Sequence, residues 1–116
     1  MGLKRGYIYW TDFGPPRGKE KCYRRPVAVV SINPLNDLLP VVVVVPGTKG
    51  ANKRRDFQTS VRVSVMDSGL PLETVFQAFD VTAVDPAKVE PGEIGKLSGV
   101  ALTRLETAIR FTLGLQ

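Results

Sequence analysis

The sequence predicts a mainly β domain of the α+β class, in which a strongly curved and mostly antiparallel sheet closes on itself. Strand-length runs of β-favouring residues alternate with turn-forming residues along most of the chain, and helical periodicity is clear only near the C-terminal end. The chain has 116 residues, of which 43% are hydrophobic, enough for one core. Residues 1–116 are therefore expected to form a single domain.

Three strands are expected in the first half of the chain. Residues 7–13 are rich in aromatic and β-favouring side chains, and the Gly- and Pro-rich residues 14–18 should end them in a long loop. Residues 26–31 and 39–45 are nearly continuous apolar runs, which favour strands buried on both faces. The intervening residues 33–37 predict a turn or one short helical turn.

The middle of the chain should complete the sheet. Residues 46–50 contain Pro and Gly and are expected to end the third strand. Residues 59–65 alternate between polar and apolar side chains, which indicates a half-exposed strand. A further strand pair is expected to flank residues 68–71, with residues 72–84 forming one long, bent central strand.

A helix is predicted over residues 99–113. Ser98 has the side chain of an N-cap, and Leu102, Leu105 and Ile109 recur at helical spacing on one side. We expect this helix to pack on the sheet, with short helices only in the connections between strands.

Composition excludes several kinds of chemistry. The chain has one cysteine, Cys22, and no histidine, which excludes an internal disulfide, a Cys/His zinc set and His-dependent nucleophilic catalysis. We expect no metal and no cofactor. No apolar run approaches the length of a membrane span, and the basic N-terminus leads directly into a strand rather than a signal peptide. A cytoplasmic protein without membrane contact is the expectation.

Positive charge is concentrated in the first half of the chain. The net charge is +5, but residues 1–62 carry +8 and residues 63–116 carry −3. The cations cluster in Arg17–Arg25 and Lys49–Arg55, near the aromatic residues Tyr23 and Phe57. Basic loops beside aromatic rings suit single-stranded nucleic acid. A solubilising surface explains the same charge, and composition does not separate the two interpretations.

The order and spacing of several segments carry a resemblance to a known family. These segments are Arg5–Glu20, Arg24–Ser31, Val45–Thr48, Val84-Asp85 with the following Lys88, and Ile94–Ser98 before the final helix. Together they closely resemble the MazF/PemK family, the toxin halves of bacterial toxin-antitoxin pairs, over about Lys4 to Leu115. The resemblance implies an SH3-like barrel, a homodimer, and metal-independent, sequence-specific endoribonuclease activity on single-stranded RNA.

The same resemblance implies partners. It predicts inhibition by a cognate antitoxin with an acidic C-terminal segment, and contact with DNA only indirectly, through the antitoxin complex. Two alternatives share the fold: a catalytically diverged nucleic-acid-binding module, and a toxin that inhibits DNA gyrase.

The resemblance also implies site residues. The family's essential Arg before Pro matches Arg25, and its essential Thr or Ser after the third strand matches Thr48. Glu20 matches an acidic position in a loop, residues 12–24, that covers RNA in the family. The expected RNA-binding residues are Arg17, Lys19, Lys21, Arg24, Lys49, Lys53, Arg54 and Phe57.

These residue types fit RNA cleavage by attack of the substrate's own 2′-OH, which leaves a 2′,3′-cyclic phosphate and a 5′-OH end. The Arg25 fork can stabilise charge on the phosphate, the Thr48 hydroxyl can donate to a phosphate oxygen, and Glu20 is a candidate base. Local sequence alone also allows an ion-paired Arg25, a turn hydroxyl at Thr48 and a surface ion pair at Glu20. The catalytic interpretation requires Arg25 and Thr48 to converge on one phosphodiester.

The sequence departs from the family pattern in two places. Residues 79–82 read Phe-Asp-Val-Thr where many members have Asp-Gln-hydrophobic-Arg, so we expect a cation and an amide to be missing from the groove. Thr48 is flanked by Gly47 and Lys49, where many members have a second hydroxyl. The departures at residues 79–82 motivate the two alternative functions.

Overall fold

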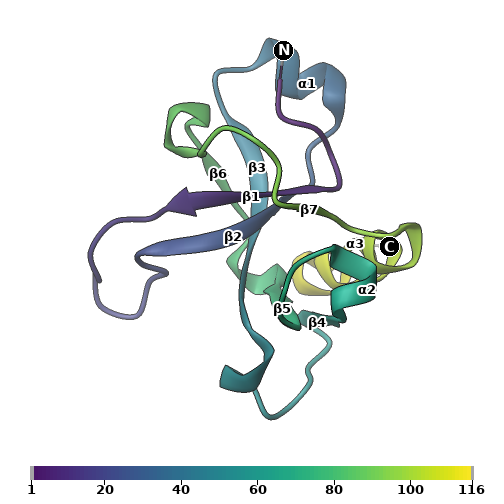
Figure 1. The fold of residues 1–116 in the computed structure, drawn as a ribbon. Coiled ribbons are helices and arrows are strands. Elements are labelled where there is room, and N and C mark those ends of the chain that lie inside the picture. Colours follow the sequence, from purple (N-terminus) through teal and green to yellow (C-terminus); the bar gives the residue numbers. More distant parts are fainter. Residues whose placement is uncertain (1, 116) are drawn as a thin grey trace.

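Seven antiparallel strands form one curled sheet in the computed structural model, which describes residues 2–115 (Figure 1). The sheet order is β4-β5-β3-β2-β1-β7, and β6 pairs with β3 off this path. The strands are β1 (Tyr7–Asp12), β2 (Arg24–Val29), β3 (Val42–Lys49), β4 (Ser60–Val63), β5 (Thr74–Gln77), β6 (Thr82–Val84) and β7 (Gly95–Lys96). The predicted fold class, a curved antiparallel sheet with connecting helices, is confirmed.

The helices lie in the connections and at the C-terminal end. They are α1 (Asn33–Leu38), α2 (Val65–Ser68) and α3 (Gly99–Leu113), with the 3₁₀ turns η1 (Gly50–Asn52), η2 (Ala78–Asp80) and η3 (Pro86–Lys88). The short helical turn expected between β2 and β3 is therefore α1. Within residues 2–115, no helix combines the length and the apolar character that crossing a membrane requires.

The predicted C-terminal helix is confirmed with its cap. The Ser98 side chain accepts a hydrogen bond from the Ala101 amide at 3.1 Å, and Gly114 ends the helix in the left-handed conformation with φ 69°. Leu105 is buried on the face of α3 that packs against β4 and η2, whereas Arg110 is exposed. α3 thus closes one end of the core.

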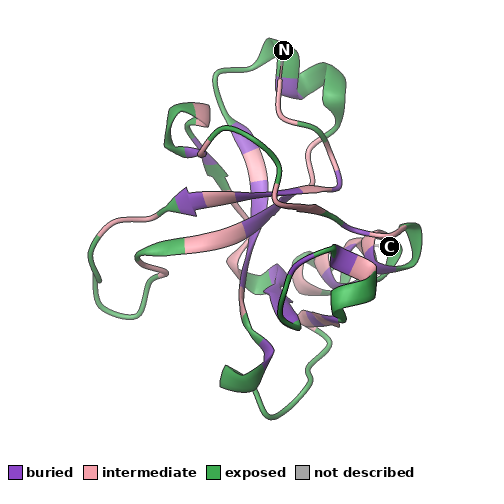
Figure 2. Ribbon diagram, viewed as in Figure 1, coloured by how far each residue is buried: buried purple, intermediate pink, exposed green. Residues whose placement is uncertain are grey.

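Both faces of the central strands are covered. Ile8 and Phe76 belong to an apolar cluster that includes α3, whereas Tyr9 and Val27 belong to a second cluster on the opposite face of the sheet. Figure 2 shows buried residues concentrated where the strands cross, whereas the β1–β2 and β3–β4 loops are mostly exposed. This agrees with the apolar runs predicted for β2 and β3.

β3 begins three residues later than the predicted 39–45 and continues through Pro46 to Lys49. Its first part pairs with β2 and β6, and from Gly47 onward it pairs with β5. The Val43 carbonyl accepts from the Val30 amide of the β2 side, so by alternation the Pro46 nitrogen points to the opposite edge. That edge has no partner at Pro46, because pairing with β6 ends at Val44, and the missing N–H therefore breaks no ladder.

Residues 65–84 also differ from the prediction. The expected strand before residues 68–71 is instead the helix α2, since the Ser64 hydroxyl caps it by accepting from the Asp67 amide. The expected long strand over residues 72–84 is divided into β5 and β6 by η2. β7 was not predicted, because two residues carry no periodic signal.

Candidate active site

Arg25 and Thr48 lie at the place where β2 and β3 diverge. The last paired residues of these strands are Val27 and Pro46, so both candidates lie two residues beyond the ladder, at corresponding positions. From Gly47 onward β3 turns to pair with β5, and a space opens between the two strand ends. The register therefore places Arg25 and Thr48 at corresponding positions on the two sides of this space.

Two adjoining hollows occupy this space, and Arg25, Thr48 and Asn52 line both of them. The apolar hollow, of about 400 Å³, is further lined by Trp10, Tyr23, Pro26, Leu70, Leu72 and Ile94. The polar hollow, of about 390 Å³, is further lined by Lys19, Glu20, Lys21, Lys53, Gln77 and Asp80. Arg25 and Thr48 therefore stand on the boundary between a surface suited to bases and one suited to phosphate.

Arg25 has most of its donors free. Its Nε donates to the Cys22 carbonyl at 3.1 Å, and it forms no ion pair with any residue in the range 2–115. The carboxylate partner that local sequence allowed is thus not found in that range. One bond to a backbone carbonyl orients the fork and leaves its two terminal nitrogens available for an anion.

Thr48 is a strand residue and not the turn residue that local sequence allowed. It pairs with Val75 of β5, and its Oγ1 accepts a hydrogen bond from Asn52 Nδ2 at 3.4 Å. Because Asn52 is the donor, the hydroxyl proton of Thr48 remains available to a phosphate oxygen.

The β1–β2 loop brings three predicted residues to the polar hollow. Lys19, Glu20 and Lys21 line it together with Arg25 and Thr48, and Glu20 forms no ion pair within the described part of the chain. Lys53 reaches the same hollow from the β3–β4 loop, whereas Lys49 lines the apolar hollow.

Other predicted RNA-binding residues lie elsewhere. Arg17 lines a third hollow of about 660 Å³, and Glu20 and Lys21 line both this hollow and the polar one. Arg54 and Phe57 line none of the hollows described here, and the Phe57 ring is 59% exposed with the Arg55 guanidinium 5.8 Å from its centre. These three residues therefore line neither of the two hollows that Arg25 and Thr48 share.

Arg24 lies on the rim of the apolar hollow and is already engaged. Its guanidinium lies 4.2 Å from the centre of the Trp10 ring and is hydrogen-bonded to the carboxylate of Glu90. This bond raises the pKa of Arg24 and lowers the pKa of Glu90, so both stay charged at neutral pH.

Gln77 is a site residue that the sequence interpretation missed. It is 8% exposed at the end of β5 and lines the polar hollow with Arg25 and Thr48. The expectation of a missing amide concerned residues 79–82, and Gln77 brings an amide to the hollow from a different position. The available signal was a lone amide inside an apolar run, Val75 to Phe79, which marks a buried polar group with a specific environment. Asp80 lines the same hollow and stands where many family members have the Gln of the Asp-Gln-hydrophobic-Arg pattern.

Comparison with known proteins identifies a family and a fold. A family model described as PemK-like, MazF-like toxin of type II toxin-antitoxin system matches residues 4–113. Endoribonuclease MazF9 of Mycobacterium tuberculosis is 31% identical over 119 residues, covering 97% of this chain and 98% of that protein. Endoribonuclease MazF6 of the same species is 47% identical over 36 residues, covering 31% of this chain and 32% of that protein.

Solved structures share the fold at lower identity. A mycobacterial endoribonuclease in complex with its cognate antitoxin superposes with a TM-score of 0.79 at 24% identity, covering 98% of this chain and 97% of that one. MazF from Deinococcus radiodurans gives a TM-score of 0.81 at 19% identity, covering 99% of each chain. At identities below 25%, these structures show that the fold is shared, that is, the arrangement of strands and helices.

Proposed function

Since this chain belongs to the family of PemK-like, MazF-like toxins of type II toxin-antitoxin systems, we propose that it is an endoribonuclease that cleaves single-stranded RNA. The proposal includes sequence-specific, metal-independent cleavage in the cytoplasm and inhibition by a cognate antitoxin. The relative MazF9, which spans nearly the whole chain, is named an endoribonuclease. The observation that carries the proposal is the position of Arg25 and Thr48 on the boundary between the two hollows.

The charge of the polar hollow favours a phosphate. Four cations, Lys19, Lys21, Arg25 and Lys53, face two carboxylates, Glu20 and Asp80. The excess of positive charge attracts the RNA backbone. The apolar hollow next to it offers Trp10 and Tyr23 for stacking of a neighbouring base.

The chemistry follows from the groups at this boundary. The 2′-oxygen bonds to phosphorus as its proton passes to the Glu20 carboxylate, and the bond from phosphorus to the 5′-oxygen breaks. The leaving 5′-oxygen takes a proton from water, and the hydroxide that remains takes the proton from Glu20, which restores the carboxylate. The products are a 2′,3′-cyclic phosphate and a 5′-OH end. Arg25 and the Thr48 hydroxyl stabilise the negative charge that builds up on the phosphoryl oxygens.

The proposed partners follow from charge and from the family. The +8 of residues 1–62 suits an antitoxin with an acidic C-terminal segment, and a relative of the same fold has been solved in complex with its cognate antitoxin. Contact with DNA would come only through that antitoxin. We also propose a homodimer, which light scattering at micromolar concentration tests, and a monomer there would contradict it.

Asp80 is the observation that favours a second candidate function. A carboxylate at the polar hollow disfavours the additional negative charge that builds up on the phosphate during cleavage, which fits a module that binds nucleic acid without cleaving it, or a gyrase inhibitor of the same fold. Such a protein would bind RNA without cutting it, or would arrest growth while messenger RNA stays intact.

One assay separates the two functions. Purified protein is incubated with single-stranded RNAs of several sequences in EDTA, and the ends of the products are mapped. The proposed function predicts cleavage at a short recurring motif with cyclic phosphate and 5′-OH ends, and little cleavage of the same sequences as duplexes. Intact RNA at all sequences and protein concentrations would reject it.

A further inference from the structure

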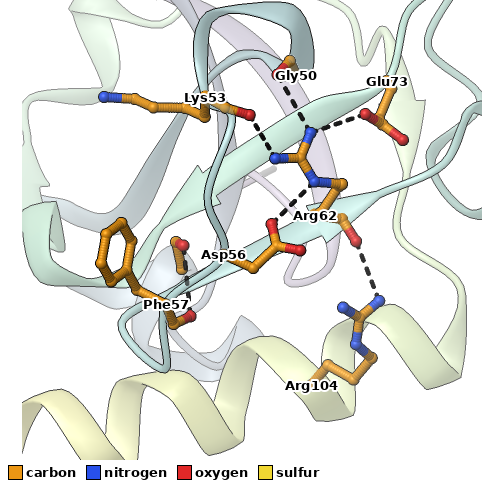
Figure 3. A network of polar contacts seen from close by, with 8 residues as sticks. Gly50, Lys53, Asp56, Phe57, Arg62, Glu73 and Arg104 are labelled. Carbon is orange, nitrogen blue, oxygen red and sulfur yellow. Dashed lines mark hydrogen bonds and ion pairs between the residues drawn. The ribbon is translucent and has the colours of Figure 1, made fainter.

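Arg62 makes more polar contacts than any predicted site residue, although it lies in β4 and lines neither hollow at the boundary (Figure 3). Its Nε donates to Asp56 Oδ1 at 2.9 Å, and its Nη2 donates to the Lys53 carbonyl at 2.5 Å. Its Nη1 donates to the Gly50 carbonyl at 3.1 Å and to Glu73 Oε1 at 2.9 Å. All three nitrogens of one guanidinium are thus used.

Two of these acceptors are backbone carbonyls at the two ends of η1. Gly50 begins this turn and Lys53 follows it, and the Lys53 amide in turn donates to the Gly50 carbonyl at 3.0 Å. The Gly50 amide donates to the Glu73 carbonyl at 2.8 Å, which joins the turn to the start of β5. Arg62 therefore ties both ends of η1 to β4, while the Gly50 amide ties the start of the turn to β5.

η1 matters because of the side chains it presents. Asn52 lines both hollows and donates to Thr48 Oγ1, and Lys53 lines the polar hollow. A shift of the turn would move the Asn52 amide away from the hydroxyl and the Lys53 ammonium away from the phosphate position. Small displacements of groups that position a substrate cost large factors in rate.

Arg62 also forms an ion pair with Asp56, which supplies the one carboxylate of the β3–β4 loop. Residues 49–57 contain four cations, Lys49, Lys53, Arg54 and Arg55, and a single acid, Asp56. Glu73 and Asp56 both accept hydrogen bonds from Arg62. These bonds raise the pKa of the guanidinium, and the bond to Glu73 contributes more than the bond to Asp56. Without Arg62, Asp56 would be free to pair with a cation of its own loop and would compete there with RNA.

We propose that Arg62 is a positioning residue that holds the β3–β4 loop so that Asn52 and Lys53 meet the Arg25 and Thr48 boundary. The part of this inference that concerns RNA rests on the proposed function. Lysine could not replace Arg62, because a planar fork reaches acceptors in several directions while an ammonium is a point charge on a flexible stem.

The test compares Arg62→Lys, which keeps the charge and loses the fork, with the wild-type protein. Amide hydrogen exchange of residues 50–59 is expected to rise by about tenfold or more, while exchange in α3 stays unchanged. RNA cleavage is expected to lose about tenfold in kcat/KM, mainly through a higher KM, since the loop cations are displaced. Asp56→Asn, which keeps the bonds to both carbonyls, should lose less than Arg62→Lys.

Arg104→Gln is the matched control. Arg104 lies in α3 and donates from Nη1 to the Arg62 carbonyl at 3.1 Å, and it makes none of the contacts to the loop (Figure 3). Its replacement removes one arginine from the same neighbourhood and should leave both loop exchange and KM within about twofold of the wild type.

The outcomes separate this inference from the proposed function. Unchanged loop exchange in Arg62→Lys overturns the positioning role, whatever the RNA assay gives, and a loosened loop with unchanged RNA affinity and KM overturns its link to the site. A wild-type protein that cuts no RNA contradicts the proposed function. In that case amide exchange of the loop, together with RNA binding measured by fluorescence anisotropy, still tests the positioning role of Arg62. If Arg62→Lys does not fold, Glu73→Gln removes one charged acceptor, and unaltered loop exchange there contradicts the inference.

Discussion

Arg24 and Glu90 form an ion pair with two hydrogen bonds, in which Nε and Nη2 donate to the two carboxylate oxygens at 2.7 and 2.8 Å. The neighbouring Arg25 has no such partner among residues 2–115. Two adjacent arginines at the same strand end therefore differ in what they offer to RNA. Arg25 presents free donors, whereas a phosphate must compete with Glu90 for Arg24.

Replacing Glu90 by Gln should strengthen RNA binding by about threefold at low salt, because Arg24 loses a competing carboxylate that is exposed and therefore weakly bound. The slope of log Kd against log salt concentration should steepen by about 1, the amount expected for one additional phosphate contact. Fluorescence anisotropy with a short single-stranded RNA measures both. Glu93→Gln makes the same change in net charge, and an equal gain in that variant would show that overall charge alone is responsible.

The same pair predicts a dependence of stability on pH. The hydrogen bond from Arg24 lowers the pKa of Glu90, so the folded state holds the proton less tightly than the unfolded state. The stabilisation is complete above the ordinary glutamate pKa of about 4.3 and is lost as the pH falls through the lowered value. The gap in urea midpoint between wild type and Glu90→Gln should shrink from pH 6 to about pH 3. A gap that stays constant would contradict this.

Arg25→Ala should reduce cleavage by about 10²- to 10³-fold in kcat, since it removes the free donors nearest the proposed scissile phosphate. Arg25→Lys should recover only part of the rate, because an ammonium cannot make a bidentate contact with phosphate. Single-turnover cleavage with saturating enzyme measures the chemical step. Both variants should have unfolding midpoints close to that of the wild type, which shows that they are folded. Full activity of a folded Arg25→Ala would show that Arg25 takes no part in the mechanism.

Thr48 gives a test with two nearly isosteric replacements. Thr48→Ser keeps the hydroxyl and should retain most of the activity, whereas Thr48→Val keeps the β-branched shape and should lose about tenfold or more, as for other lost hydrogen bonds in a transition state. The strand pairing with Val75 is a backbone contact, so neither change should unfold β3. Equal activity of the two variants would mean that the hydroxyl plays no part.

The elements that the sequence predicted well carry their signal locally. β1, β2 and β4 contain runs or alternations of β-favouring residues, and α3 has its N-cap at Ser98 and its glycine at Gly114. The course of β3 through Pro46 was missed because it depends on which neighbour lies at each edge, and that is decided by residues far away in the chain.

The site was predictable only in part. Composition indicated basic loops, and only the resemblance singled out Arg25 and Thr48 as catalytic. The local sequence also fits a structural role for each, an ion-paired arginine at a strand entry and a turn hydroxyl. Gln77 and Arg62 were missed because their roles arise from tertiary contacts: one is buried beside the boundary, and the other bonds to backbone carbonyls that any residue would supply. The contacts of Arg62 leave no pattern in residue type or spacing, whereas the lone amide of Gln77 inside an apolar run was a signal that the sequence interpretation did not use.

The last prediction concerns the core beneath the site. Thr11 of β1 is fully buried, and its Oγ1 has no hydrogen-bond partner within the described structure. A buried hydroxyl without a partner costs free energy, so Thr11→Val should raise the free energy of unfolding by about 1 kcal/mol. Thr74→Val is the opposite control, because the buried Thr74 hydroxyl donates to the Leu72 carbonyl at 3.1 Å and its loss should destabilise the fold. Urea unfolding measures both, and a destabilised Thr11→Val would show that this hydroxyl is satisfied in solution.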